Sequence, residues 1–182
     1  MRTKNILSIA ALIICGLVCV NSVKAQTSDV TVNIKFQPIQ SIVVNSAQKT
    51  VDLVYKDEND YANGVSAEML NHLEVFSTGG FIVTANTDGD FTRTADSSIP
   101  AANVKVKATN GTGTNNGTFT EVALSTAPTT LITATEGGRA LKYNVTYDNT
   151  AGASDAYINK YKKADETVSV YTAKVTYTIA TN

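Results

Sequence analysis

The stretch Thr167–Asn182, TVSVYTAKVTYTIATN, indicates the fold class of this chain. From Tyr171 onward every second residue is apolar or aromatic until Ile179, and threonine or lysine lies between them. Successive side chains of a strand point to opposite faces of a sheet, so the pattern predicts a strand with one buried and one solvated face. Val168 and Val170 fall out of phase with it, which predicts a β-bulge at Val170–Tyr171.

Short segments of the same kind occur along the rest of the chain. Turns rich in Gly, Asn, Asp and Thr separate them, and no long segment has the 3.6-residue period of a helix. The pattern predicts an all-β protein, an antiparallel immunoglobulin-like β-sandwich of about nine or ten strands, with a closed barrel as the alternative. Besides Tyr171–Ile179, the predicted strands are Asp29–Phe36, Ile42–Asn45, Lys49–Tyr55, His72–Ser77, Phe81–Thr87, Asn103–Ala108, Phe119–Leu124, Thr130–Thr135 and Leu141–Tyr147.

Three segments carry more local expectations. Thr78-Gly79-Gly80 lies between two predicted strands, which predicts a β-hairpin over His72–Thr87. Ala67–Leu70 could form one helical turn, which is too short to be an independent helix. Ala156–Glu166 fits either a strand or a loop.

The first 25 residues have the pattern of an export signal. Arg2 and Lys4 supply a positive start, Ile6–Val20 is a short apolar core, and small residues precede a predicted cleavage between Ala25 and Gln26. The apolar run is short for a membrane span, so no retained transmembrane helix is expected, and an uncleaved anchor helix is the alternative. We therefore expect export through the inner membrane, to the periplasm, the cell surface or the medium, and a single β-sandwich domain over residues 26–182.

The two cysteines, Cys15 and Cys19, both lie in the predicted signal. A mature chain without cysteine forms no disulfide and has no thiolate for catalysis or metal binding. Three of the fifteen Lys and Arg residues also leave with the signal, whereas all sixteen Asp and Glu residues stay. The resulting acidic chain argues against nucleic acid as a partner.

Residues that could support chemistry are few. His72 is the only histidine, and no Ser-His signature accompanies it, so we interpret it as a structural residue on the solvated face of its strand, opposite Leu73. Asn86, Asp88 and Asp90 surround a tight turn and are weak candidates for a calcium site, although a complete loop motif would need more ligands. The expectation is a protein that is not an enzyme and that has no cofactor.

Aromatic residues offer a second kind of candidate. Tyr143, Tyr147, Tyr171 and Tyr177 are in phase with aliphatic neighbours, which favours packing in the core. Tyr157 and Tyr161 lie in a lysine-rich stretch and are better candidates for exposure, where their rings could stack on a sugar.

The closing segment YTAKVTYTI, Tyr171–Ile179, resembles the last strand of WxL-type cell-surface domains. Tyr177-x-Ile179 stands where that family has Trp-x-Leu, and Gly80-Phe81-Ile82-Val83 corresponds to the family's earlier motif, again without tryptophan. The chain is also similar to exported β-sandwich proteins of Bacteroidetes and to spore-coat-U-like fimbrial subunits. The WxL resemblance implies a β-sandwich and non-covalent attachment to the cell wall.

Together these patterns predict a non-catalytic exported structural protein of the cell surface, such as an envelope or fibre subunit or an adhesin-like module. The expected partners are other protein subunits, through pairing of an edge strand. A module that binds peptidoglycan or another surface glycan is the alternative.

Overall fold

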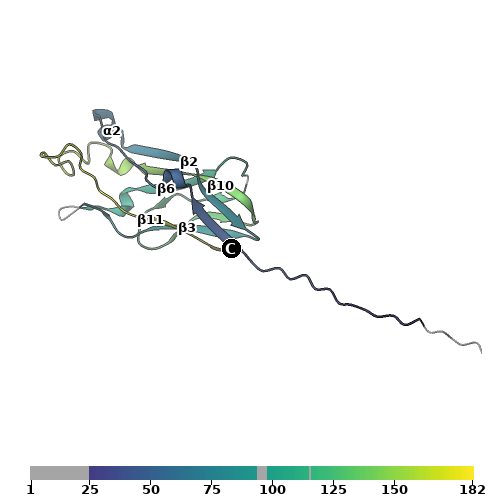
Figure 1. Ribbon diagram of the computed structural model, residues 1–182. Helices are drawn as coiled ribbons and strands as arrows, with labels where there is room; N and C mark the ends of the chain where they lie inside the picture. The colour runs from purple at the N-terminus through teal and green to yellow at the C-terminus, as the bar shows by residue number, and fades with distance from the viewer. Residues whose placement is uncertain (1–24, 94–97, 115) are drawn as a thin grey trace, which may run out of the picture. The chain divides into compact units, whose positions relative to one another are not determined.

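The structure is a computed structural model in which residues 25–93, 98–114 and 116–182 are described. The chain divides into two compact units, Met1–Phe36 and Gln37–Asn182. The described residues of the second unit form eleven strands, one short α-helix and three 3₁₀ turns (Figure 1). The strands are β1 (Gln40–Val44), β2 (Val65–Ser77), β3 (Phe81–Thr87), β4 (Phe91–Thr92), β5 (Ser98–Ile99), β6 (Lys105–Asn110), β7 (Thr118–Phe119), β8 (Val122–Ala123), β9 (Thr129–Ala134), β10 (Gly138–Asn149) and β11 (Val175–Thr181).

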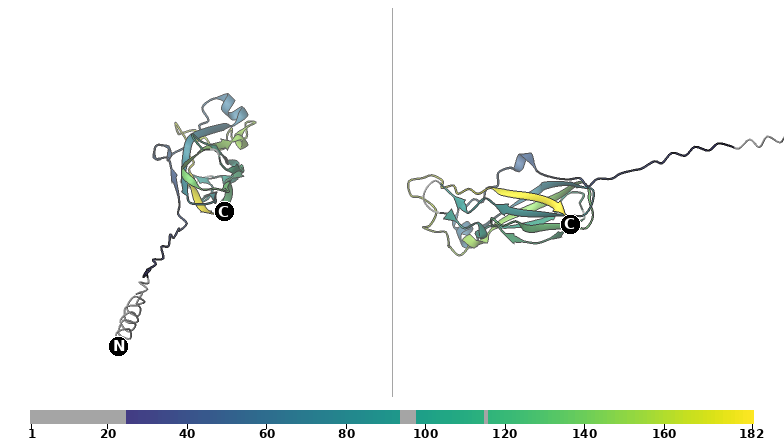
Figure 2. Two further views of the ribbon diagram at one scale, coloured as in Figure 1. Left: turned by 90° about the vertical axis from the view of Figure 1, so that its right-hand side faces the viewer. Right: turned by 90° about the horizontal axis from the view of Figure 1, so that it is seen from below.

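The second unit is an antiparallel β-sandwich, as the sequence predicts. One sheet has the strand order β1-β2-β10-β6-β8 and the other the order β11-β3-β9-β7. Strands β4 and β5 form a separate two-stranded sheet. Figure 2 shows the strands of the second unit as stacked layers. Among the described strands, β1 and β11 are therefore each the last strand of their sheet.

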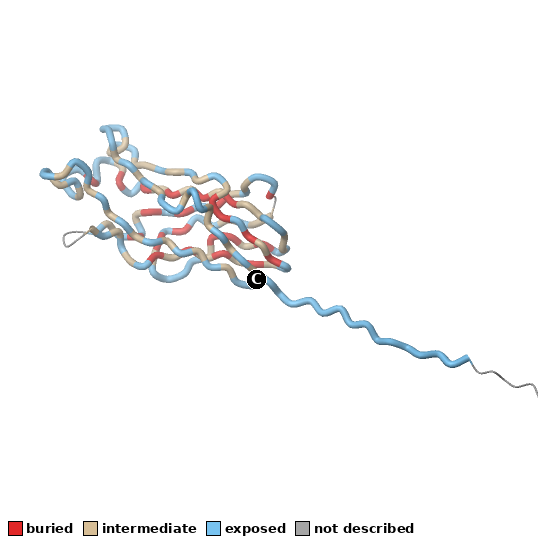
Figure 3. The backbone as a smooth tube through the Cα atoms, in the orientation of Figure 1, coloured by how far each residue is buried: buried red, intermediate tan, exposed pale blue. Residues whose placement is uncertain are grey.

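The core lies between the two larger sheets, where the buried positions concentrate (Figure 3). Alternate residues of β3, β6 and β10 point inward, which is the period of two that the sequence shows. The largest fully buried side chains include Leu73, Phe81, Leu124, Leu131, Ile132 and Tyr143.

The predicted hairpin over His72–Thr87 is wrong. Strand β2 belongs to the five-stranded sheet and β3 to the four-stranded one, so Thr78-Gly79-Gly80 carries the chain from one sheet to the other. The turn passes close to the opposite backbone, since a Cβ on Gly80 would lie 2.9 Å from the carbonyl oxygen of Thr135. The same Gly-rich signal therefore marks a crossing between layers.

Two further local predictions are wrong. Lys49–Tyr55 pairs with no strand of the described residues, although Val51, Leu53 and Tyr55 do alternate as half-buried positions. Ala67–Leu70 lies inside β2, because pairing with β10 overrides its weak helical tendency. The charged residues that precede this strand instead form the short helix α2, Glu58–Asn63.

The C-terminal strand is shorter than the sequence predicts. Strand β11 begins at Val175, and before it only Thr172 makes a bridge, to Thr92. Val168 and Val170 lie outside any strand and are exposed, so no bulge forms at Val170–Tyr171. The alternation itself persists, since every second residue from Tyr171 to Ile179 is half-buried.

The described part of the first unit, residues 25–36, has no helix or strand, and each of its residues is exposed. The predicted strand Asp29–Phe36 is therefore absent, although its apolar alternation is as regular as that of any strand in the sandwich. Its four apolar side chains are 77–91 % exposed: Val30, Val32, Ile34 and Phe36. The rest of the predicted export signal, residues 1–24, lies outside the described residues.

Candidate functional site

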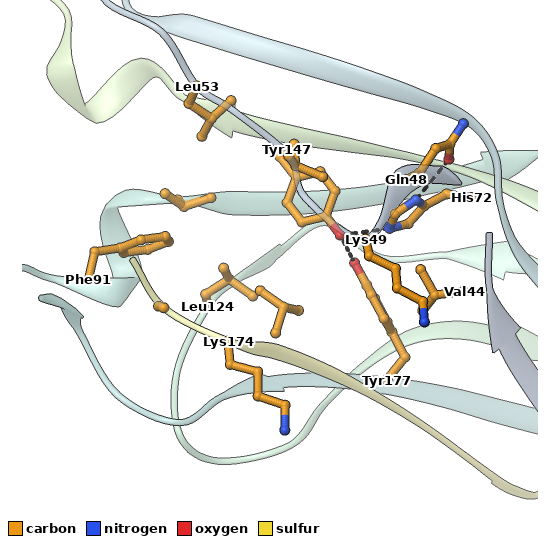
Figure 4. Close-up of a pocket in the computed structure, with 14 residues that line it drawn as sticks. Val44, Gln48, Lys49, Leu53, His72, Phe91, Leu124, Tyr147, Lys174 and Tyr177 are labelled. Atoms are coloured by element: carbon orange, nitrogen blue, oxygen red, sulfur yellow. Dashed lines mark hydrogen bonds between the residues drawn. The ribbon is translucent and has the colours of Figure 1, made fainter. Parts of the chain in front are cut away.

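An apolar pocket of about 400 Å³ opens on the side of the sandwich where β11 ends its sheet (Figure 4). One wall is the last part of the chain, Ala173–Tyr177, and the other is the segment that follows β1. We call this pocket the open-edge groove. It is lined by Val44, Gln48, Lys49, Val51, Leu53, His72, Phe91, Val104, Leu124, Tyr147, Ala173, Lys174, Val175 and Tyr177.

The backbone along one wall of the groove has a free edge. The main-chain groups of Thr172 and Lys174 bond toward Thr92 and Asp88, on the β3 side of the strand. Since main-chain groups of successive strand residues point to opposite sides, those of Ala173, Val175 and Tyr177 face away from β3. No described strand pairs with that side of β11.

His72 lies in the inner wall of the groove, so the predicted position on the solvated face is wrong. The register between β2 and β10 shifts between Tyr143 and Val145, because three residues of β2 lie opposite one residue of β10. Asn71 in this bulge has a φ of 50°, and its N–H donates to Oδ1 of Asn144. The bulge turns both His72 and its neighbour Leu73 toward the interior.

A chain of hydrogen bonds runs through His72 and joins the two sheets. Its Nδ1 lies 3.0 Å from Oε1 of Gln48 and its Nε2 lies 3.0 Å from the hydroxyl of Tyr147, which in turn lies 2.6 Å from the hydroxyl of Tyr177 (Figure 4). Because the Gln48 oxygen only accepts, Nδ1–H donates to it and Nε2 accepts from Tyr147. This is the arrangement that a neutral imidazole makes with these two partners.

Burial sets the titration of these groups. It lowers the pKa of His72, which keeps the ring neutral. It raises the pKa of Tyr147, and it raises the pKa of Tyr177 well above the ordinary value, with the neighbouring Tyr147 hydroxyl adding to the effect. A neutral histidine hydrogen-bonded to the Gln48 amide and to the protonated phenol of Tyr147 favours a structural role over that of a base with a nucleophile.

Two of the three weak calcium candidates have carboxylates with main-chain partners. Oδ1 of Asp90 accepts from the N–H of Ala101, and Oδ1 of Asp88 accepts from the N–H of Lys174. Asn86 is a half-buried residue of β3. Within residues 25–93, 98–114 and 116–182 no group of three or more His, Cys, Asp or Glu side chains could hold a metal ion.

A cluster of tyrosines forms a second candidate region. The rings of Tyr157 and Tyr161 meet edge to face with centroids 4.9 Å apart, and Tyr171 packs on the other side of Tyr161 at 5.5 Å. Tyr55 contacts both Tyr157 and Tyr61. These five rings line a depression of about 730 Å³, together with Asp52, Val54, Lys56, Ile99, Lys162 and Thr167–Val170.

The predicted exposure of Tyr157 is wrong, because only 7 % of this residue is accessible. Its hydroxyl accepts hydrogen bonds from the side-chain amides of Asn103 and Asn149. Oδ1 of Asn149 accepts from the Tyr55 hydroxyl at 2.6 Å, so one buried asparagine holds both tyrosines. Tyr161 is half-buried and keeps part of its ring accessible.

Sequence reasoning identified two residues of the tyrosine cluster but missed the open-edge groove. The sequence pattern that belongs to this groove is the apolar alternation of two segments far apart in the chain, Lys49–Tyr55 and Tyr171–Ile179. The alternation of each segment predicts a strand that pairs within a sheet. Only their placement on either side of an unpaired edge makes them the walls of a groove.

No helix in the described part of the chain is long and apolar enough to cross a membrane. No protein-family model matches the sequence, and a search of curated proteins finds no match. The two stretches that carry the WxL resemblance do lie together, because β3 and β11 pair with Val83 opposite Ile179.

Proposed function

We propose that this protein is a non-catalytic, exported structural subunit of the cell surface, in the envelope or in a surface fibre. The observation that carries the proposal is the exposed apolar alternation of Val30, Val32, Ile34 and Phe36. Monomeric soluble proteins seldom leave such a contiguous apolar face to water, and a face of this kind marks a contact with another molecule. A segment with the pattern of a strand but no strand partner is suited to assembly.

The chemistry of the sandwich supports the same proposal. The single histidine is neutral and fully engaged in hydrogen bonds between the sheets. The acidic turn residues Asp88 and Asp90 accept from main-chain N–H groups, which stabilises loops. These roles are structural.

Localisation tests the proposal directly. Cells that express the protein are fractionated, and intact cells are treated with a protease before the chain is detected with an antibody against the sandwich. We expect the mature chain in the envelope fraction and cleavage of its exposed segment on intact cells. Recovery of the full-length chain in the cytoplasm would contradict the proposal.

The tyrosine cluster favours a second candidate function, the binding of a cell-wall or surface glycan. A half-buried ring beside a wide depression offers a face on which a sugar could stack, and Asp52, Lys56 and Lys162 at the same site could bond to hydroxyls. A pull-down with purified cell wall tests it. Tyr161→Ala should reduce retention, whereas the matched control Tyr161→Phe, which keeps the ring, should bind as the wild type does; equal retention of all three would rule out this site.

A further inference from the structure

We propose that residues Asp29–Phe36 of one copy of this chain insert as a β-strand into the open-edge groove of a second copy. The inference rests on the proposed function, since it specifies how such a subunit would assemble.

The inserting segment has the chemistry of a strand that covers a sandwich. Four apolar side chains alternate with Thr31, Asn33 and Lys35, so one face is apolar and the other polar along eight residues. At about 3.3 Å per residue the segment is roughly 26 Å long as a strand. The wall of the groove, Ala173–Tyr177, is shorter than this, so the segment would pair along the wall and continue beside the rest of β11.

The groove has what such a strand needs. Its free edge presents the main-chain groups of Ala173, Val175 and Tyr177, which can pair with an added strand. Between its two walls the lining is apolar and includes Phe91, Val104 and Leu124. A strand laid on this edge would place one face on that lining and the other in solvent, as the alternation of the segment requires.

The chain between the segment and β1 disfavours insertion into the same copy. The N–H of Ile39 donates to Oγ1 of Thr78, and the N–H of Thr78 donates to the carbonyl of Ile39, so Ile39 is already held beside β2. Only Gln37 and Pro38 remain to reverse the chain after Phe36. Two-residue hairpins need a positive φ at the first central residue, and the proline ring fixes φ near −65° at the second, which the commonest of these turns excludes.

The arrangement has a consequence for symmetry. The inserting segment and the groove are different surfaces of the chain, so each copy offers one of each and the contact is head to tail. A head-to-tail contact that does not close into a ring continues as a filament. Each copy inside the filament would therefore hold a neighbour's segment in its groove and insert its own segment into the next copy.

A matched pair of variants of the full mature chain tests whether the apolar face of Asp29–Phe36 is needed for assembly. Ile34→Asp introduces a charge on the face that would be buried, and Asn33→Asp introduces the same charge on the face that would remain in solvent. We expect filaments by electron microscopy and high-mass species by light scattering for the wild type and Asn33→Asp, and monomers for Ile34→Asp. The Ile34→Asp monomer should keep the circular-dichroism spectrum of a folded β-sandwich, because the substitution changes no residue of Gln37–Asn182.

A binding measurement tests the groove itself. A labelled peptide of residues 29–36 is titrated into the monomeric Ile34→Asp variant, and we expect it to bind at least about tenfold more tightly than a peptide with Ile34→Asp, since burial of an unpaired carboxylate is costly. The assembly and the peptide selectivity are both required. The proposal is overturned if the wild type stays monomeric at every concentration, whether or not its N-terminal segment resists protease. It is also overturned if the two peptides bind equally or if neither binds. Because both experiments use purified protein, they are decided independently of where the chain is found in the cell.

Discussion

The buried imidazole of His72 joins Gln48 to Tyr147 in the wall of the groove, and this position makes the fold sensitive to acid. Its pKa is lowered by burial, so below the ordinary value of about 6.5 the unfolded chain binds a proton that the folded chain does not. The contribution of His72 is thus fully present above that value and is lost as the pH falls through it toward the folded-state pKa. We predict that the free energy of unfolding of the wild type decreases over this window.

The matched variant for this prediction is His72→Phe, measured by urea denaturation from neutral to mildly acidic pH. It should be less stable than the wild type at neutral pH by about 1–3 kcal/mol, because the Tyr147 hydroxyl and Gln48 lose a partner. The difference between the two proteins should narrow on acidification, since the variant has no imidazole to charge. A constant difference would show that His72 does not titrate with folding.

At Thr87, in contrast to His72, we predict that a substitution increases the stability of the fold. Its side chain is 2 % exposed, and its hydroxyl has no hydrogen-bond partner among the described residues. Thr87→Val replaces a buried, unsatisfied hydroxyl with a methyl group of similar size, so we expect stabilisation of about 1 kcal/mol in thermal or urea unfolding. Thr84→Val, at a half-buried position of the same strand, is the control and should change stability less.

At the scale of elements, the Gln37-Pro38 dipeptide decides where the N-terminal segment can go. Replacing it with Asn-Gly supplies the residues that a two-residue type I′ turn requires. We predict that this variant inserts its own segment into its own groove, becomes monomeric, and protects residues 29–36 from protease and from hydrogen exchange. Ala-Pro, which keeps the proline and lacks the Asn-Gly signal, is the matched control and should form filaments as the wild type does. Filaments of the Asn-Gly variant as long as those of the wild type would contradict the prediction.

The elements also show what the sequence can and cannot predict. Alternation in Leu141–Tyr147 and Phe81–Thr87 correctly predicts β10 and β3, because each strand pairs with neighbours on both sides and buries one face between the two sheets. The same alternation in Asp29–Phe36 and Lys49–Tyr55 predicts strands that the structure lacks. A period of two shows that the apolar side chains lie on one face, but it does not show whether the chain provides a neighbouring strand for pairing. The predicted exposure of His72 is wrong for a related reason. The bulge at Asn71 that turns its side chain inward depends on the register of β2 with β10, which alternation within one strand does not reveal.

At the scale of the whole molecule, a head-to-tail contact predicts how assembly can be stopped. Free peptide of residues 29–36 would fill a groove but carries no groove of its own, so no further copy could be added there. An excess of peptide added before assembly should therefore shorten filaments as its concentration rises. Length distributions from electron microscopy measure the effect. The control is the peptide with Ile34→Asp, which should leave filament length unchanged, and identical lengths with both peptides would contradict a strand-filled groove.

The hydroxyl pair of Tyr147 and Tyr177 gives the groove an optical signature of its own. The chain contains eight tyrosines and no tryptophan, so its near-ultraviolet absorption and emission come from phenol rings. Two of those rings line the groove and share a hydrogen bond of 2.6 Å. A strand that covers them removes water from their surroundings, so unlabelled protein should report the filling of its groove through a change in tyrosine emission, in real time and in dilute solution.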